Sequence, residues 1–162
     1  MITPRLQKII DLSEKKTIAD IGTDHAYIPI RMAQLGKIEK AIASDKNRGP
    51  IEIAKTNIEK YGFSDIIETR CADGLSELGC GEVEEIIIAG MGGVLIGDII
   101  EANLKVARSA RLLLQPMNAQ YELRKKLEIL GFKIVREELE KEGFKVYNFI
   151  IAQYDENLKK EQ

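Results

Sequence analysis

Short apolar runs alternate with amphipathic stretches along most of the 162 residues. Runs such as TIADIG and EEIIIAG have the length and the β-branched content of strands, and the stretches between them place apolar residues at helical spacing. The pattern predicts strands at 17–22, 38–45, 66–73, 84–90 and 110–116, and helices at 27–36, 49–62, 93–107 and 119–131. Such alternation, interpreted as five β–α units, predicts a parallel sheet with helices on both faces.

The alternation of strands and helices stops after Gly131. Residues 132–143 and 144–155 are two strand candidates with no helix between them, and a Glu-Gly link joins them. This arrangement predicts an antiparallel hairpin. The whole chain is therefore expected to form an α/β fold whose mostly parallel seven-stranded sheet ends in that hairpin. The very apolar segment 84–90 is expected to be a central strand buried on both faces. Residues 1–155 are expected to form one domain, and 156–162 a solvated tail or the start of a further helical segment.

Composition excludes several classes of protein. With 24 basic and 26 acidic residues the net charge is −2, so bulk charge does not indicate a nucleic-acid binder, although a local basic face remains compatible with it. No apolar run is long enough for a membrane span, and the N-terminus lacks the apolar core of a signal peptide, which predicts a cytoplasmic protein. Cys71 and Cys80 lie nine residues apart, which is neither a metal-binding spacing nor a disulfide framework. No metal is expected, and nothing in the sequence indicates the oligomeric state.

The first strand leads into the acidic turn DIGTDHAYIP, residues 20–29. A dinucleotide-binding turn needs the pattern G-x-G-x-x-G, but this chain has Gly22, Asp24 and Tyr27 at the three glycine positions. The carboxylate of Asp24 would also repel a diphosphate, so an NAD-dependent oxidoreductase is disfavoured. A nucleoside that carries positive charge removes both difficulties. S-adenosylmethionine (SAM), with a sulfonium and an ammonium group, is such a ligand.

Further acidic residues follow the next two predicted strands. Asp45 comes 23 residues after Gly22, near the offset at which an acid binds ribose hydroxyls in nucleoside-binding α/β folds. Asp73, followed by Gly74, ends the third strand and is a candidate to accept the adenine amino group. Each acid alone is also a common helix cap or turn residue. Because three acids follow consecutive strands, they predict a nucleoside cleft.

The ends of the fourth and fifth strands are less specific. The segment AGMGG, residues 89–93, is either a flexible loop facing the transferred methyl group or a tight helix start that needs glycine conformations. Gln115 in QPM is a candidate to orient a base edge, and a turn before Pro116 explains it equally well.

The motifs DIGTDHAYIP, ASDKNRGP, CADGL, IAGMGG and LLLQPM, in this order and spacing, resemble the bacterial tRNA adenine-22-N1 methyltransferases over about residues 2–151. The resemblance implies a Rossmann-like class I methyltransferase fold, SAM as donor, and N1 of a tRNA adenine as acceptor. Members of this family usually continue into a C-terminal helical extension that helps to grip tRNA, whereas this sequence ends at Gln162. The cofactor-binding residues that we predict from these motifs are Asp20, Gly22, Asp45, Lys46, Asp73, Gly74, Gly90, Met91 and Gly92.

Catalytic candidates lie in the acidic turn. After N1 is methylated, the adenine is cationic until N6 releases a proton, and the carboxylate of Asp24 is our candidate to stabilise that charge and accept the proton. His25 is the alternative base, or a hydrogen-bonded turn residue. Tyr27 is a candidate to stack on the target base or donate to it, or simply packs at the helix start. The RNA-binding residues that we predict are Arg5, Lys8, Arg48 and Gln115.

Two alternatives remain open at this point. The first is a SAM-dependent methyltransferase that acts on a small molecule or a protein, which the slightly negative net charge permits. The second is a SAM-binding or RNA-binding module without turnover. The acids at 20, 24, 45 and 73 argue against a module that has lost its chemistry.

Overall fold

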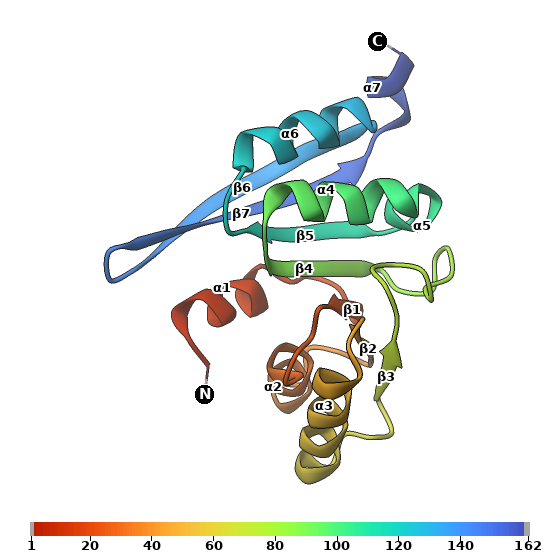
Figure 1. Ribbon diagram of the computed structural model, residues 1–162, viewed down its shortest axis with the longest axis vertical. Coiled ribbons are helices and arrows are strands. Elements are labelled where there is room, and N and C mark those ends of the chain that lie inside the picture. The colour runs from red at the N-terminus through yellow and green to blue at the C-terminus, as the bar shows by residue number, and fades with distance from the viewer. Residues whose placement is uncertain (1, 161–162) are drawn as a thin grey trace.

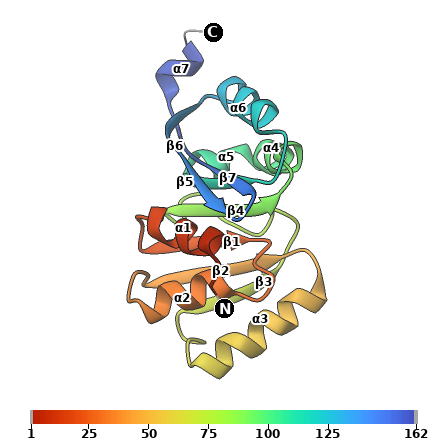
Figure 2. The same cartoon turned by 90° about the vertical axis from the view of Figure 1, so that its left-hand side faces the viewer.

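A mostly parallel sheet of seven strands forms the centre of the computed structural model, which describes residues 2–160. The strand order is β3-β2-β1-β4-β5-β7-β6, from β3 near the bottom of Figure 2 to β6 near the top. The first five strands in this order pair in parallel, whereas β7 is antiparallel to both β5 and β6. The predicted fold class is therefore confirmed. The strands are β1 (Thr17–Ile21), β2 (Lys40–Asp45), β3 (Ile67–Cys71), β4 (Glu85–Met91), β5 (Arg111–Pro116), β6 (Phe132–Glu142) and β7 (Lys145–Tyr154).

Seven helices are described. The first helix was not predicted, and the expected helix at 93–107 is divided in two at Asn103. A short helix follows β7, in the segment for which the sequence left open a solvated tail or the start of a further helical segment. The helices are α1 (Pro4–Leu12), α2 (Tyr27–Gln34), α3 (Arg48–Tyr61), α4 (Gly93–Ala102), α5 (Leu104–Arg108), α6 (Gln120–Ile129) and α7 (Glu156–Lys160).

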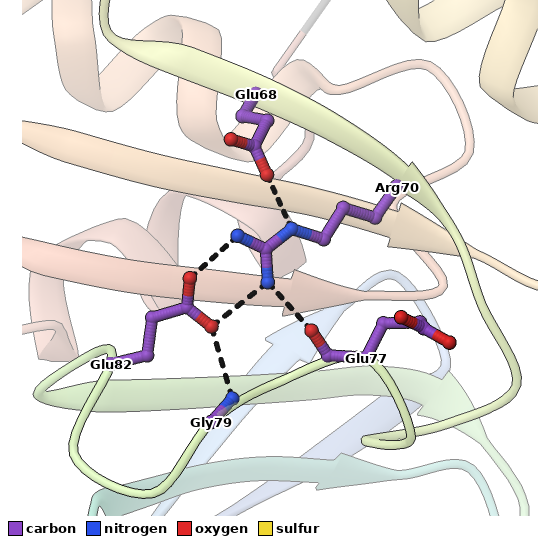
Figure 3. Close-up of polar contacts among 5 residues, drawn as sticks. All are labelled: Glu68, Arg70, Glu77, Gly79 and Glu82. Atoms are coloured by element: carbon purple, nitrogen blue, oxygen red, sulfur yellow. Dashed lines mark hydrogen bonds and ion pairs between the residues drawn. The ribbon is translucent and has the colours of Figure 1, made fainter.

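The connection from β3 to β4 contains turns and no helix, so the expectation of five β–α units is wrong at this point. Arg70 of β3 holds this connection (Figure 3). Its guanidinium donates to both carboxylate oxygens of Glu82, at 2.8 and 2.5 Å, and to the main-chain oxygen of Glu77 at 2.7 Å. Glu68 accepts from the same guanidinium. The hydrogen bond from Arg70 holds the pKa of Glu82 at about 2, so the Glu82 carboxylate stays charged.

Two apolar cores cover the two faces of the sheet. The side chains of Ile86 and Ile88 in β4 pack on the core beneath α4, α5 and α6, while Ile87 packs on the core beneath α1, α2 and α3. All three isoleucines are fully buried. The prediction that this strand is central and buried on both faces is confirmed. Because the helices cover both faces, the ends of the strands are left as the place for a ligand site.

The helix α1 is fixed at both ends. The Thr3 hydroxyl accepts from the Leu6 amide at 3.2 Å, and Pro4 occupies the first helical turn, which is a typical helix start. At the other end, Arg111 of β5 donates to the main-chain oxygen of Leu12 at 3.2 Å and pairs with the fully buried Glu85. Ser13 also donates to Glu85. These contacts tie the C-terminal end of α1 to the first residues of β4 and β5, while Arg5 in its first turn donates to Gln115 near the carboxyl end of β5 at 2.8 Å. The start of α1 therefore lies close to the carboxyl end of β4 (Figure 1).

The predicted hairpin is formed by β6 and β7, joined by Gly143 and Phe144. Gly143 has a φ of 63°, as the first loop position of a type II′ turn requires. The hairpin projects beyond the ends of β4 and β5 on the left of Figure 1. Within residues 2–160, the structure contains no helix that is long and apolar enough to cross a membrane.

Candidate functional site

A cavity of about 380 Å³ opens at the carboxyl ends of β1, β2, β3 and β4. This volume lies within the range of small-molecule sites. Many of its lining residues were predicted from the sequence, and they come from four separate strand ends. They are Gly22 and Asp24 after β1, Asp45 and Lys46 after β2, Asp73 and Gly74 after β3, and Gly90 and Met91 at the end of β4.

The turn after β1 has an unusual backbone. Gly22, Asp24 and Ala26 have φ values of 73°, 57° and 62°, in the left-handed region that favours glycine. The amides of Gly22 and Thr23 donate to the main-chain oxygen of Ser44 at 2.8 and 2.9 Å, which ties the turn to β2. A Cβ atom at position 22 would lie 2.5 Å from Met91 Cε, so Gly22 leaves room for the tip of the Met91 side chain. Strain of this kind is typical of functional sites.

The three catalytic candidates form a continuous group on this turn. His25 Nδ1 lies 3.1 Å from Asp24 Oδ2, and the His25 and Tyr27 rings stack with centroids 5.0 Å apart and planes at 7°. The Asp24 side chain is 66% exposed, and Asp24 lines the cavity. His25 and Tyr27 lie beside the cavity and are not part of its lining. A solvent-accessible carboxylate at the rim of the cleft can accept a proton from a ligand.

Asp20 lies beneath the turn and is only 3% exposed. It accepts a hydrogen bond from the Thr23 hydroxyl at 2.8 Å. The pKa of Asp20 is raised to about 7, mainly by burial. The hydrogen bond from Thr23 and the charge of Arg5 act against this rise, and the carboxylates of Asp45 and Asp24 contribute to it. Asp20 does not line the cavity. It is a buried residue that holds the turn after β1 through Thr23.

The residues present fit a nucleoside with a cationic group. Carboxylates of Asp24, Asp45 and Asp73 surround the cavity, so a cation is attracted and a diphosphate is repelled. One oxygen of Asp45 accepts from the Asn47 amide at 3.0 Å, which fixes this side chain at the rim. Across residues 2–160, no cluster of three or more His, Cys, Asp or Glu side chains is arranged to hold a metal ion.

The loops after β4 and β5 are held together by main-chain hydrogen bonds. The Met117 amide donates to the Met91 oxygen at 2.8 Å, and the Gly93 amide donates to the Asn118 oxygen at 3.0 Å. A Cβ atom at position 93 would lie 2.4 Å from the Ala119 oxygen, and one at position 92 would lie 2.9 Å from Asn118 Oδ1. This packing explains Gly92 and Gly93 as a tight helix start. Gly92, a predicted cofactor residue, lies against Asn118 and not in the lining.

Comparison with known proteins shows the family to which the chain belongs. A family profile described as a methyltransferase domain matches residues 2–150. The chain belongs to the methyltransferase domain family. It is 36% identical over 154 residues to the tRNA (adenine(22)-N(1))-methyltransferase of Bacillus subtilis, a match that covers 94% of this chain and 65% of that protein. The chain thus spans about two thirds of the length of this relative.

Two solved structures resemble this methyltransferase domain closely. The B. subtilis m1A22 tRNA methyltransferase TrmK has a TM-score of 0.91 at 35% identity, over 96% of this chain and 67% of that one. TrmK of M. capricolum, in complex with S-adenosyl-homocysteine, has a TM-score of 0.85 at 28% identity, over 96% of this chain and 70% of that one.

The predicted RNA-binding residues occupy different surroundings in the methyltransferase domain. Arg48 is exposed at the start of α3, close to the rim formed by Lys46. Lys8 pairs with Glu138 of β6 at 2.8 Å. Arg5 and Gln115 bond to each other at 2.8 Å, and Gln115 is only 1% exposed. The structure therefore does not gather these four side chains into one basic face.

Several residues of the site were missed in the sequence. Leu95 and Ile99 of α4 line the cavity, and their spacing of four residues places them on one face of the helix. That spacing was visible in the sequence but is equally typical of core residues. Asn57 of α3 donates to the main-chain oxygen of His25 at 2.9 Å and so fixes the turn after β1. The two residues are 32 positions apart in the sequence. No local pattern indicates such a contact.

Proposed function

We propose that this chain transfers a methyl group from SAM to N1 of adenine 22 in tRNA. The observation that carries the proposal is the acid-lined cavity at four strand ends, built around a glycine turn. The B. subtilis relative is named for this reaction, and the M. capricolum relative was solved with S-adenosyl-homocysteine, the demethylated form of SAM. A tRNA substrate would place the reaction in the cytoplasm.

The cleft residues divide into groups that suit the parts of the donor. Asp45 is in the place for ribose hydroxyls, and Asp73 with Gly74 for the adenine amino group. Gly22, Gly90 and Met91 form the close-packed floor beside the first turn. Asp24 supplies negative charge near the position of a sulfonium or ammonium group. When bound, SAM supplies a methyl group on a cationic sulfur, which the lone pair of adenine N1 attacks.

Asp24 is our candidate for the proton acceptor. Methylation at N1 leaves a positive charge on the adenine, and loss of a proton from N6 neutralises it. The Asp24 carboxylate is at the rim, and the imidazole of His25, 3.1 Å away, orients it. The stacked pair of His25 and Tyr27 offers a flat surface beside this carboxylate on which an extruded base could lie.

The test is incubation of the chain with SAM and unmodified tRNA, followed by mapping of N1-methyladenine by primer-extension arrest. We expect arrest at position 22 and none when the tRNA carries guanine there. The Asp24→Ala variant should still bind SAM but lose most of the methyl transfer. SAM binding without product on any tRNA would favour a non-catalytic module. Transfer only to small molecules or proteins would favour the other alternative.

A further inference from the structure

The buried carboxamide of Gln115 joins three elements at the acceptor side of the cleft. Its Oε1 accepts from Arg5 Nη1 of α1 at 2.8 Å and from the Gly90 amide of β4 at 3.1 Å. Its Nε2 donates to the Pro116 oxygen and to Met117 Sδ, both at 3.3 Å. Because the carboxamide already has partners on both its oxygen and its nitrogen and is 1% exposed, Gln115 has little capacity left for a direct contact with a ligand.

Arg5, in contrast, is only partly buried and lies beside Gly90 of the cavity lining. A Cβ atom at Gly90 would be 3.5 Å from Arg5 Nη1, so the guanidinium rests on the loop that lines the cavity. Its Cζ is 5.9 Å from the ring centroid of Tyr147 in β7. Arg5 is also close enough to Asp20 to act against the raised pKa of that residue. A guanidinium has five N–H donors, and the bond to Gln115 uses one of them.

The charges of the site pose a problem that Arg5 solves. The carboxylates of Asp24, Asp45 and Asp73 suit a cationic donor but repel the phosphates of an RNA acceptor. The two ligands must nevertheless meet in one cleft. Asp24, Asp45 and Asp73 lie at the ends of β1, β2 and β3, where Lys46 also lines the cavity, whereas Arg5 lies at the ends of β4 and β5. The three carboxylates and the Arg5 guanidinium therefore lie on different sides of the cleft.

We propose that Gln115 is a positioning residue that acts through Arg5, and that Arg5 binds a backbone phosphate next to the target adenine. The inference rests on the proposed function. Gln115 fixes the guanidinium and the Gly90 amide with one oxygen atom, so both are set by the end of β5. Arginine suits this role because its planar donors can hold Gln115 on one edge and a phosphate on another. This assignment replaces the direct base contact that the sequence predicts for Gln115.

The test compares Gln115→Met, Arg5→Ala and the double variant with wild type. The control variant is Lys60→Ala, because Lys60 is an exposed lysine near the far end of α3. Steady-state methylation of tRNA gives KM and kcat at several salt concentrations, and calorimetry gives the Kd for SAM. We expect KM for tRNA to rise about tenfold in Gln115→Met and in Arg5→Ala, with the Kd for SAM changed less than about twofold. Lys60→Ala should match wild type.

Two further readouts separate positioning from a purely structural role. The double variant should be no worse than Arg5→Ala, because Gln115 acts through that side chain. In a plot of log KM for tRNA against log salt concentration, the slope should be smaller by about one in each variant than in wild type. This is the change expected when one phosphate contact is lost. An Arg5→Ala variant with wild-type KM and salt slope would overturn the inference, as would additive losses in the double variant. Arg5→Lys keeps the charge but loses the planar set of guanidinium donors, so its KM for tRNA should lie between those of wild type and Arg5→Ala. This variant tests the inference even if Gln115→Met folds poorly. Absence of tRNA methylation by the wild-type chain would instead refute the proposed function itself.

Discussion

Gly93 begins α4 with its α-carbon directly against the backbone of the loop after β5. A Cβ atom there would lie 2.4 Å from the Ala119 oxygen and 2.7 Å from the Asn118 oxygen. Neither oxygen belongs to a flexible side chain, so the two loops would have to separate. We expect Gly93→Ala to lower the free energy of unfolding by about 2 kcal/mol, as overpacking of a rigid site does. Gly49→Ala is the matched control, since nothing lies within 4 Å of its Cβ position. Urea unfolding measures both, and equal stability of the two variants would contradict this packing.

Asp20 makes stability depend on pH in a direction opposite to that of most carboxylates. Its pKa is about 7 in the folded chain and near 3.8 when exposed, so the folded state holds the proton more tightly. Between pH 4 and 7 the folded state therefore binds more protons, and the free energy of unfolding falls as the pH rises. We expect this residue to contribute a fall of a few kcal/mol across that range.

The variant Asp20→Asn isolates this contribution, because an amide keeps the shape but does not titrate. Urea unfolding at pH 5, 6, 7 and 8 should show that the difference in stability between variant and wild type grows in favour of the variant as the pH rises. Asp65→Asn, at an exposed carboxylate, is the control and should follow wild type. Parallel curves for wild type and Asp20→Asn would show that Asp20 is ionised throughout.

At the residue scale, the part of the site that follows strands could be predicted from the sequence. Asp45, Asp73 and Gly22 stand immediately after apolar runs, and parallel strands bring their carboxyl ends to one edge. The contact between Arg5 and Gln115 could not be predicted, because 110 residues separate them and neither stands in a local pattern that requires the other. The positive φ of Asp24 is likewise a result of the ties from the turn to β2 and α3.

Among the elements, the connection from β3 to β4 depends most on one side chain. Arg70 holds Glu82, Glu77 and Glu68 (Figure 3). The same connection contains the cavity residues Asp73 and Gly74. We expect Arg70→Ala to lower the free energy of unfolding by about 2 kcal/mol, as the loss of several charge-assisted hydrogen bonds does. The Kd for SAM should rise several-fold because the connection that carries Asp73 is no longer held by Arg70.

The control for this experiment is Lys16→Ala, which removes a solvent-exposed ion pair with Glu39 at 3.8 Å. Such pairs contribute less than about 1 kcal/mol, so stability and SAM binding should stay near wild type. Thermal unfolding and calorimetry measure both quantities. If Arg70→Ala behaved like Lys16→Ala, the connection would be held by its turns alone.

Most elements with strong periodicity were predicted. The helix α1 is an exception: it was missed although Thr3-Pro4 is a helix-start signal and Leu6, Ile9 and Ile10 stand at helical spacing. The helix expected at 93–107 breaks at Asn103, whose backbone has φ −136° and ψ 59°. The connection after β3 holds Gly74, Gly79 and Gly81, which weaken a helix, and its conformation depends on the distant clamp of Arg70.

For the whole molecule, the arrangement of charge matters more than its sum. A net charge of −2 gives no indication of the ligand, whereas the fold places carboxylates at the ends of β1, β2 and β3 and the Arg5 guanidinium at the ends of β4 and β5. The order of the strands produces this separation, since β1 and β4 are neighbours at the centre of the sheet. A cationic nucleoside and an anionic acceptor can then approach from two sides of one cleft.

Calorimetric titration of the chain with SAM and with NAD⁺ tests this charge arrangement most directly. We expect SAM to bind with a stoichiometry of about one and NAD⁺ to give no measurable heat, because the carboxylates around the cavity repel its diphosphate. Asp45→Asn should weaken SAM binding by about tenfold, with Asp65→Asn as the matched control. Binding of NAD⁺ in the cleft with SAM excluded would contradict the assignment of this site.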